Sequence, residues 1–186
     1  MARELTSGRI VIWYFALILA VGCERLAELV VAKRHAAWAF ARGGIESGKR
    51  HYPAMVVLHA GLLVACLVEV QVADRPFLPL LGVTALVFVL AAQALRWWCI
   101  GTLGNLWNTR IIVVPGLALV RRGPYRFMPH PNYLAVAVEG AALPLVHSAW
   151  ITAIVFTVLN AVLLLGFRIP AEERALRTVA APVTSS

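Results

Sequence analysis

The fold is decided by the stretch Tyr133–Phe167, which is YLAVAVEGAALPLVHSAWITAIVFTVLNAVLLLGF. This stretch is apolar almost throughout, and it is longer than the roughly 20 residues that one membrane-spanning helix needs. It is interrupted near its middle by the polar pair His147-Ser148. We therefore predict a tight helical hairpin in which Tyr133–Val146 forms the first arm and Trp150–Phe167 forms the second. The first arm is short for a full crossing, so we expect it to tilt or to be covered by other helices.

The whole chain shares this apolar character. Hydrophobic residues make up 61% of its 186 residues and charged residues only 14%, with a mean hydropathy of +0.80. A soluble domain has about 45–50% apolar and about 25% charged residues, so this composition excludes a soluble enzyme, a disordered tail and a nucleic-acid reader. The net charge of +8 would suit nucleic acid or an anionic membrane surface, and the hydropathy favours the membrane.

Three more apolar segments precede the hairpin, namely Ile10–Val31, Ala54–Ala73 and Phe77–Ile100. Together with the two hairpin arms they predict an all-α integral membrane protein with about five transmembrane helices. We divide the chain into residues 1–100, which hold three transmembrane helices and a cytoplasmic loop over 32–53, and residues 101–186, which form the functional core.

The distribution of Lys and Arg predicts the orientation, because cytoplasmic loops carry an excess of both residues. Five crossings leave three basic residues on the side of the N-terminus (Arg3, Arg9 and Arg75) and one inside a span (Arg25). The other side collects Lys33, Arg34, Arg42, Lys49, Arg50, Arg96, Arg110, Arg121, Arg122, Arg126, Arg168, Arg174 and Arg177. We therefore place the N-terminus outside the cell membrane and the C-terminus in the cytoplasm.

Polar residues are concentrated in the stretches 32–53 and 101–132 and after Phe167, which predicts a cytoplasmic site at the membrane surface. The richest stretch is Gly123–Tyr133, GPYRFMPHPNY, whose prolines forbid a continuous helix. Its aromatic, imidazole and amide groups suit a small polar ligand. They equally suit a turn that leads into a helix, with Tyr125 and Tyr133 in an interfacial belt, and the residues alone leave both readings open.

A second polar cluster follows the hairpin at Arg168-Ile169-Pro170-Ala171-Glu172-Glu173. In a helix, Arg168 and Glu172 lie four residues apart on one face, near the point where the last span leaves the membrane. The pair fits a site, and it also fits an ordinary solvated ion pair of little energetic value. The three cysteines lie in apolar segments without metal-ligand spacing, so we expect no metal site.

The order of these pieces resembles the isoprenylcysteine carboxyl methyltransferase family of integral membrane enzymes. The resemblance runs from about Arg96 to Leu176 and consists of the segment 119–125 (LVRRGPY), the segment 130–133 (HPNY), the hydrophobic hairpin, and then Arg168 with Glu172. It implies S-adenosylmethionine as cofactor and an O-methyltransferase reaction on a lipophilic acceptor taken from the bilayer. The acceptor would be a prenylcysteine carboxylate or an alkylpyrone or alkylresorcinol hydroxyl.

The resemblance also implies roles for particular residues. Arg168 and Glu172 would face the acceptor and the transferred methyl group. The residues implied at the cofactor are Arg110, Leu117, Ala118, Leu119, Val120, Tyr125, His130, Pro131, Asn132 and Tyr133. The chain departs from the family in one place, because Pro129 stands where an arginine usually precedes the His-Pro pair. This departure weakens the case for a carboxylate acceptor, and Arg126 is a candidate replacement.

The N-terminal half resembles the small bacterial branch of the same family, which is linked to O-methylation of alkylpyrones and alkylresorcinols. The resemblance lies in the segments 24–28 (ERLAE), 33–35 (KRH), 42–53 (RGGIESGKRHYP), His59 and 107–110 (WNTR). Charges inside a span are costly and usually functional. Arg25 and Glu28 could neutralise each other, and Glu139 could face the site or pair with Arg25.

The alternative to an enzyme is a non-catalytic membrane scaffold with a degenerate cofactor site, which Pro129 supports.

Overall fold

The computed structural model describes residues 2–180, and the side chains of residues 12–178. Its helices are α1 (Ala2–Phe40), α2 (Tyr52–Val72), α3 (Pro79–Leu103), α4 (Pro131–Leu145), α5 (Trp150–Leu163) and α6 (Ile169–Ala180). Two short strands, β1 (Ile45–Ser47) and β2 (Ile111–Val113), lie between them. Four short helical turns complete the structure: η1 (Lys49–His51), η2 (Gly104–Leu106), η3 (Gly123–Arg126) and the π-helical η4 (Leu164–Arg168).

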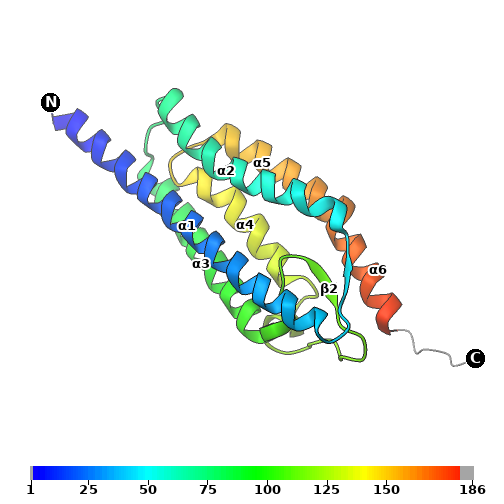
Figure 1. Ribbon diagram of the computed structural model, residues 1–186. Helices are drawn as coiled ribbons and strands as arrows, with labels where there is room; N and C mark the ends of the chain where they lie inside the picture. The colour runs from blue at the N-terminus through cyan, green and yellow to red at the C-terminus, as the bar shows by residue number, and fades with distance from the viewer. Residues whose placement is uncertain (1, 181–186) are drawn as a thin grey trace, which may run out of the picture.

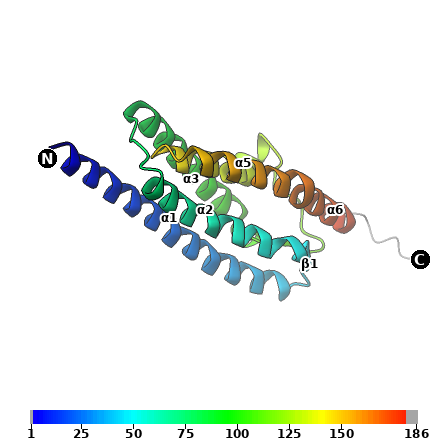
Figure 2. The same cartoon turned by 90° about the horizontal axis from the view of Figure 1, so that it is seen from above.

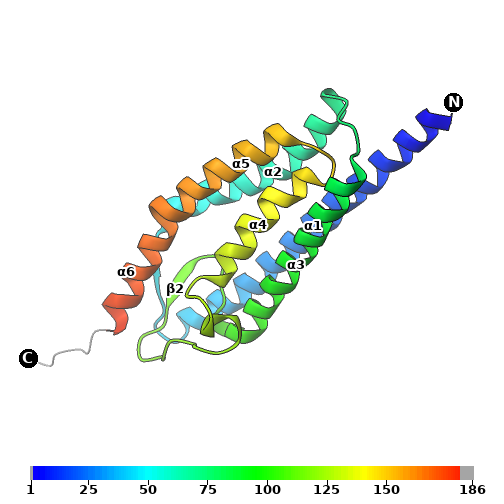
Figure 3. The ribbon, with the colours of Figure 1, turned by 180° about the vertical axis from the view of Figure 1, so that it is seen from behind.

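The long helices form one elongated bundle in which α1 begins at one end and α6 ends at the other (Figure 1). Helix α4 packs against α3 on one side and α5 on the other, and α5 also packs against α2. Seen from above, α1 and α2 run alongside each other (Figure 2). The view from behind shows that β2 and its loop lie at the same end of the bundle as α6 (Figure 3). The irregular segments of the chain are thus gathered at one end.

The helical hairpin predicted from the apolar stretch is confirmed as α4 and α5, which pack against each other. The turn between them holds the buried residues His147 and Ser148, and Ser148 has a positive φ of 57°. The carboxylate of Glu69 accepts hydrogen bonds from the backbone N–H groups of Ile151 (3.2 Å) and Thr152 (2.7 Å). Because the first N–H groups of a helix lack partners within it, Glu69 caps the start of α5.

Three helical stretches in the described part of the chain are long and apolar enough to cross a membrane: Lys49–Val72, Pro79–Leu106 and Trp150–Thr178. Their large apolar side chains point outward, as at Leu80, which is 86% exposed. A protein with this surface belongs in a bilayer. Helix α4 has only 15 residues, and α1 carries several charges, so crossing by all five helices stays a prediction.

The cytoplasmic loop predicted over residues 32–53 is shorter than expected, because α1 continues through residues 32–40. Ala32, Ala36 and Ala39 are all buried, and their spacing places them on one face of the helix. The remaining loop forms a small antiparallel sheet in which Ile45 pairs with Val113 and Ser47 pairs with Ile111. This sheet is an addition to the predicted all-α fold.

The charged residues of α1 join an ion cluster made of Glu24, Arg25 and Glu28 on α1, Gln93 and Arg96 on α3, and Glu139 on α4. Arg25 lies 2.7 Å from Glu28 and 3.2 Å from Glu139. Arg25 therefore pairs with both carboxylates, as the sequence had allowed. Arg96 pairs with Glu139 from the other side. Since Glu28, Arg96 and Glu139 are each about 95% buried, the cluster ties three helices together inside the bundle.

Candidate functional site

The candidate site is centred on Tyr133 in the first turn of α4. Its hydroxyl accepts a hydrogen bond from Arg168 Nε at 3.1 Å and donates one to the carboxylate of Glu172. Arg168 ends the π-helical turn η4 and Glu172 lies in the first turn of α6. The two residues predicted to share a helix face are therefore brought together, with the tyrosine hydroxyl between them. Arg168 is only 4% exposed, which argues against a solvated surface pair.

A second contact fixes the guanidinium of Arg168. Its Nη2 donates to the backbone carbonyl of Thr109, which lies just before β2. The hydroxyl of Tyr52 lies 3.3 Å from the Thr109 hydroxyl. The loop that carries Thr109 is tied to α1, because the Trp107 carbonyl lies 2.9 Å from His35 Nδ1. Arg168 is thus held by groups from separate parts of the chain.

The segment 130–133 lies beside this centre. The imidazole of His130 stacks on the Tyr133 ring, with 5.5 Å between ring centroids and 25° between planes. Its Nε2 lies 3.6 Å from the carboxylate of Glu173 on α6. Pro131 is fully buried at the start of α4. The buried Oδ1 of Asn132 has no hydrogen-bond partner among the residues that the structure describes, so this acceptor is available to a ligand.

Tyr125 lies in the turn η3, next to the end of α3. Burial raises the pKa of its hydroxyl above the ordinary value, and the nearby Cys99 thiol adds to the rise. The turn needs Gly123, whose φ is +57° and whose added Cβ would collide with the side chain of Thr102. These contacts hold Tyr125 against the bundle as a neutral phenol, which donates or accepts a hydrogen bond.

The other residues implied at the cofactor are more exposed. Leu117, Ala118 and Leu119 lie on the surface in irregular chain after β2, and Val120 is half-buried. The guanidinium of Arg110 lies 5.5 Å from the Tyr52 ring centroid and 3.7 Å from the Glu46 carboxylate. These five side chains are therefore not part of the Tyr133–Arg168–Glu172 centre.

Pro129 stands where the resembled family usually has an arginine, and the structure shows the surroundings of this position. Pro129 is exposed, and the guanidinium of Arg126 lies 4.3 Å over the ring of Phe127. Arg126 is itself exposed. Its charge is directed to a neighbouring aromatic side chain, so the geometry gives no support to its role as a replacement.

Sequence reasoning missed two partners in the site. The first is the Thr109 carbonyl, since a backbone acceptor carries no residue-type signal, although residues 107–110 were part of the resemblance to the small bacterial branch. The second is Glu173, which contacts His130 and is adjacent to the residue that was singled out. Among the described residues, no cluster of three or more His, Cys, Asp or Glu side chains could hold a metal ion.

Comparisons with known proteins identify one matching family and two relatives of similar length. Residues 84–178 match the model of the isoprenylcysteine carboxyl methyltransferase family. The chain is 39% identical over 166 residues to the uncharacterized protein YpbQ of Bacillus subtilis, an alignment that covers 89% of this chain and 96% of that one. It is 30% identical over 165 residues to an uncharacterized protein of Haemophilus influenzae, covering 87% and 92%. No solved structure matches.

Proposed function

Because the chain belongs to the isoprenylcysteine carboxyl methyltransferase family, we propose that it transfers a methyl group from S-adenosylmethionine to an acidic oxygen of a lipophilic acceptor. The family is one of methyltransferases, and the apolar helices make this member an integral membrane protein. The observation that carries the proposal is the Tyr133 hydroxyl, which joins the buried Arg168 to Glu172 where α4 and α6 meet.

The residues around this centre fit the cofactor. The orphaned Oδ1 of Asn132 offers an acceptor for an amino or hydroxyl group, and the partly buried ring of His130, whose side chain is 17% exposed, offers a flat face for an adenine. Tyr125, Pro131 and the segment 117–120 complete the proposed pocket, and Arg110 is proposed at its edge. When bound, S-adenosylmethionine supplies a methyl group on a positively charged sulfur, which is reactive toward an oxygen nucleophile.

Arg168 is proposed to stabilise the negative charge of the acceptor oxygen. Its guanidinium is pre-positioned by Tyr133 and by the Thr109 carbonyl, and fixed donors that face a reacting anion lower a reaction barrier without reorganisation. The family resemblance leaves two acceptors. A prenylcysteine carboxylate is already an anion, whereas an alkylpyrone or alkylresorcinol hydroxyl must first lose its proton.

Glu172 is proposed to accept that proton, with Tyr133 holding the carboxylate in place. Pro129, in the position of the family's usual arginine, removes a cation that would suit a carboxylate acceptor. Both features favour the hydroxyl acceptor over the prenylcysteine carboxylate.

The proposed orientation places the site in the cytoplasm and the start of α1 outside the cell membrane. The site, the small sheet and α6 lie at one end of the bundle, away from the start of α1 (Figure 3). Arg110, Arg121 and Arg126 lie in the irregular chain on the site's side of α3 and α4, in line with the excess of basic residues in cytoplasmic loops.

Calorimetric titration of the detergent-purified protein with S-adenosylmethionine and S-adenosylhomocysteine tests the proposal. We expect the wild type to bind both and His130→Ala to lose at least tenfold in affinity. His147→Ala is the matched control, because His147 lies at the other end of α4, and it should bind as the wild type does. A folded wild type that binds neither compound would overturn the proposal and favour a non-catalytic membrane scaffold.

A further inference from the structure

A hollow of about 440 Å³ lies next to the candidate site but on a different face of α6. Its walls come from β1, the turn η1, β2 and the face of α6 that carries Ala171, Arg174 and Ala175. Arg168 and Glu172 are not among its lining residues. The hollow is therefore separate from the Tyr133–Arg168–Glu172 centre.

The hollow has a strongly basic rim. Lys49, Arg50, His51 and Arg174 line it, and none of the described residues that line it is acidic. Glu46 lies nearby, but its carboxylate is shared between Lys49 at 3.8 Å and Arg110 at 3.7 Å. One carboxylate cannot neutralise all of these cations, so the rim keeps a net positive charge that favours an anion.

The start of α2 and the side chain of His51 add to this preference. Helix α2 begins at this rim, and no side chain in the described structure caps its N-terminus, so its positive end is open to an anion. The buried Nδ1 of His51 lacks a hydrogen-bond partner among the described residues. Gly48 makes the turn possible with a φ of +66°, and an added Cβ would lie 3.2 Å from the Ile111 side chain.

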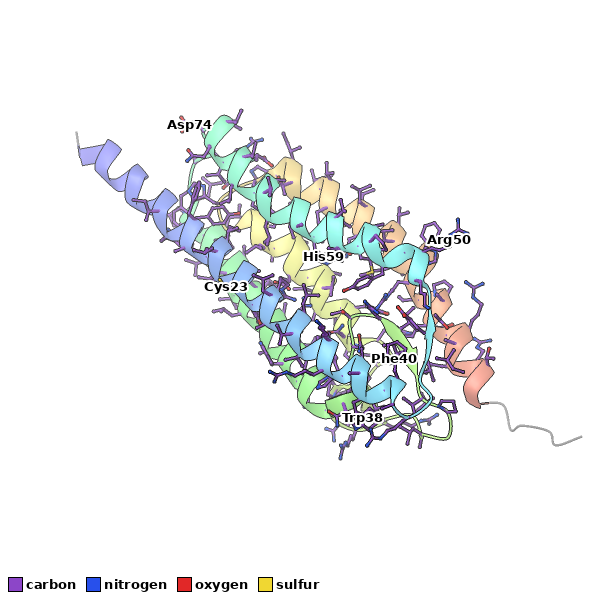
Figure 4. All side chains as sticks on the ribbon, in the orientation of Figure 1. Cys23, Trp38, Phe40, Arg50, His59 and Asp74 are labelled. Carbon is purple, nitrogen blue, oxygen red and sulfur yellow. The ribbon has the colours of Figure 1, made fainter. Side chains whose placement is uncertain are left out.

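The position of the hollow indicates what kind of anion it takes. Two candidate membrane spans meet here, because Lys49–Val72 starts at the rim and Trp150–Thr178 ends at it. Figure 4 shows Arg50 at the start of α2, and the hollow is lined both by Arg50 and by Arg174 of α6. Part of the lining, the aliphatic wall, is formed by Ile45, Val113 and Ala175. Basic and aliphatic lining residues at the ends of two candidate spans suit a ligand with an anionic head and a hydrocarbon tail.

We propose that this hollow binds the phosphate headgroup of an anionic phospholipid from the leaflet in which α2 begins. The phosphate pairs with Arg50 and Arg174 at the rim, and the upper part of an acyl chain lies against the aliphatic wall. This lipid bridges α2 and α6, and so it braces the helix that carries Glu172. The proposal does not depend on the chemistry of the methyltransferase site.

Native mass spectrometry of the purified full chain tests the proposal. The protein is titrated with phosphatidylglycerol and with phosphatidylcholine of the same acyl chains. The wild type should bind the anionic lipid at least about tenfold more tightly, and Arg50→Gln/Arg174→Gln should lose roughly tenfold of that preference, because two basic contacts to the headgroup are removed. Lys33→Gln/Arg34→Gln removes the same charge from exposed positions on α1 and should keep the preference.

Three outcomes would overturn the lipid site. The first is an unchanged lipid preference in the Arg50 and Arg174 variant. The second is an equal loss in the Lys33 and Arg34 variant, which would mean general attraction to a basic surface. The third is displacement of the lipid by inorganic phosphate at equal concentration, which would mean that the hollow recognises the phosphate without its hydrocarbon tail. Matching gel-filtration profiles of all variants serve as the folding control.

Discussion

Arg168 Nε donates to the Tyr133 hydroxyl at 3.1 Å. Tyr133 lies at the start of the first arm of the hairpin, and Arg168 lies just after the second arm. The two residues are far apart in sequence and are held together by the return of α5 alongside α4. The same hydroxyl donates to Glu172, so a phenol positions a cation and a carboxylate at once. In the proposed reaction this arrangement fixes the geometry of the acceptor.

Tyr133→Phe should lower kcat by roughly 100-fold, because a small misplacement of aligned reacting groups costs about that much. The ring and its stacking on His130 remain in this variant, so cofactor affinity should change by less than about threefold. Methyl transfer and calorimetric binding are measured together. Tyr14→Phe is the control, because its hydroxyl contacts the Leu143 carbonyl at the far end of α4. Full activity in Tyr133→Phe would show that the bridge plays no part in the reaction.

Arg168→Lys should lose most of the activity even though it keeps the positive charge. Arginine reaches Tyr133 and the Thr109 carbonyl with two different nitrogen atoms, and a lysine ammonium cannot reproduce that planar fork. We expect a loss of roughly 100-fold or more in kcat/KM, measured with a hydroxyl acceptor in detergent. Arg177→Lys, at a highly exposed position on α6, should leave the rate unchanged. Near-normal rates in Arg168→Lys would mean that a positive charge at this position is sufficient for activity without the arginine fork.

Arg25→Met should destabilise the bundle by roughly 3–5 kcal/mol, because removal of one partner leaves buried charges without compensation. Arg25 contacts Glu28 at 2.7 Å and Glu139 at 3.2 Å. The apparent Tm in detergent reports the loss. Arg25→Met/Glu139→Gln removes one carboxylate as well and should recover part of the stability. If the double variant is less stable than the single one, the attraction between Arg25 and Glu139 does not dominate.

Glu69→Gln should destabilise the hairpin by about 1–2 kcal/mol, a typical cost for the loss of a helix cap. The Glu69 carboxylate accepts from the first N–H groups of α5 and lies 2.9 Å from Arg75. Asp74→Asn removes an exposed acidic group from the turn that follows α2 (Figure 4) and should leave the Tm unchanged. Equal effects of the two substitutions would assign the loss to surface charge.

Hydropathy was sufficient to predict the hairpin and the apolar helices, because the length of an apolar stretch directly limits how it can cross a bilayer. It did not predict that α1 continues to Phe40 or that β1 pairs with β2. Both features depend on contacts with the distant loop 104–113, as in the 3.0 Å hydrogen bond from Asn108 to the Ala32 carbonyl. Local sequence carries no record of such contacts.

The sequence likewise identified some residues of the candidate site and not others. Arg168, Glu172 and the segment 130–133 were assigned to the site through the family resemblance, since the helix spacing and the prolines alone left both readings open. The bridging role of Tyr133 was not identifiable, since it requires two helix ends to meet. The basic hollow was missed for a similar reason, because Arg50 and Arg174 come together only in three dimensions.

Gly140→Ala should destabilise the hairpin by roughly 1–3 kcal/mol, the usual cost of overpacking a well-packed interior. An added Cβ at Gly140 would collide with the ring of Phe156, which is itself 97% buried and so has little room to move. The close approach of α4 to α5 at Gly140 sets the relative position of Tyr133, at the start of α4, and Arg168, after the end of α5. We therefore expect kcat to fall together with the Tm. Gly101→Ala, on α3, meets nothing within 4 Å and should leave both quantities unchanged. A lowered Tm with normal kcat would show that the site tolerates movement between the two arms of the hairpin.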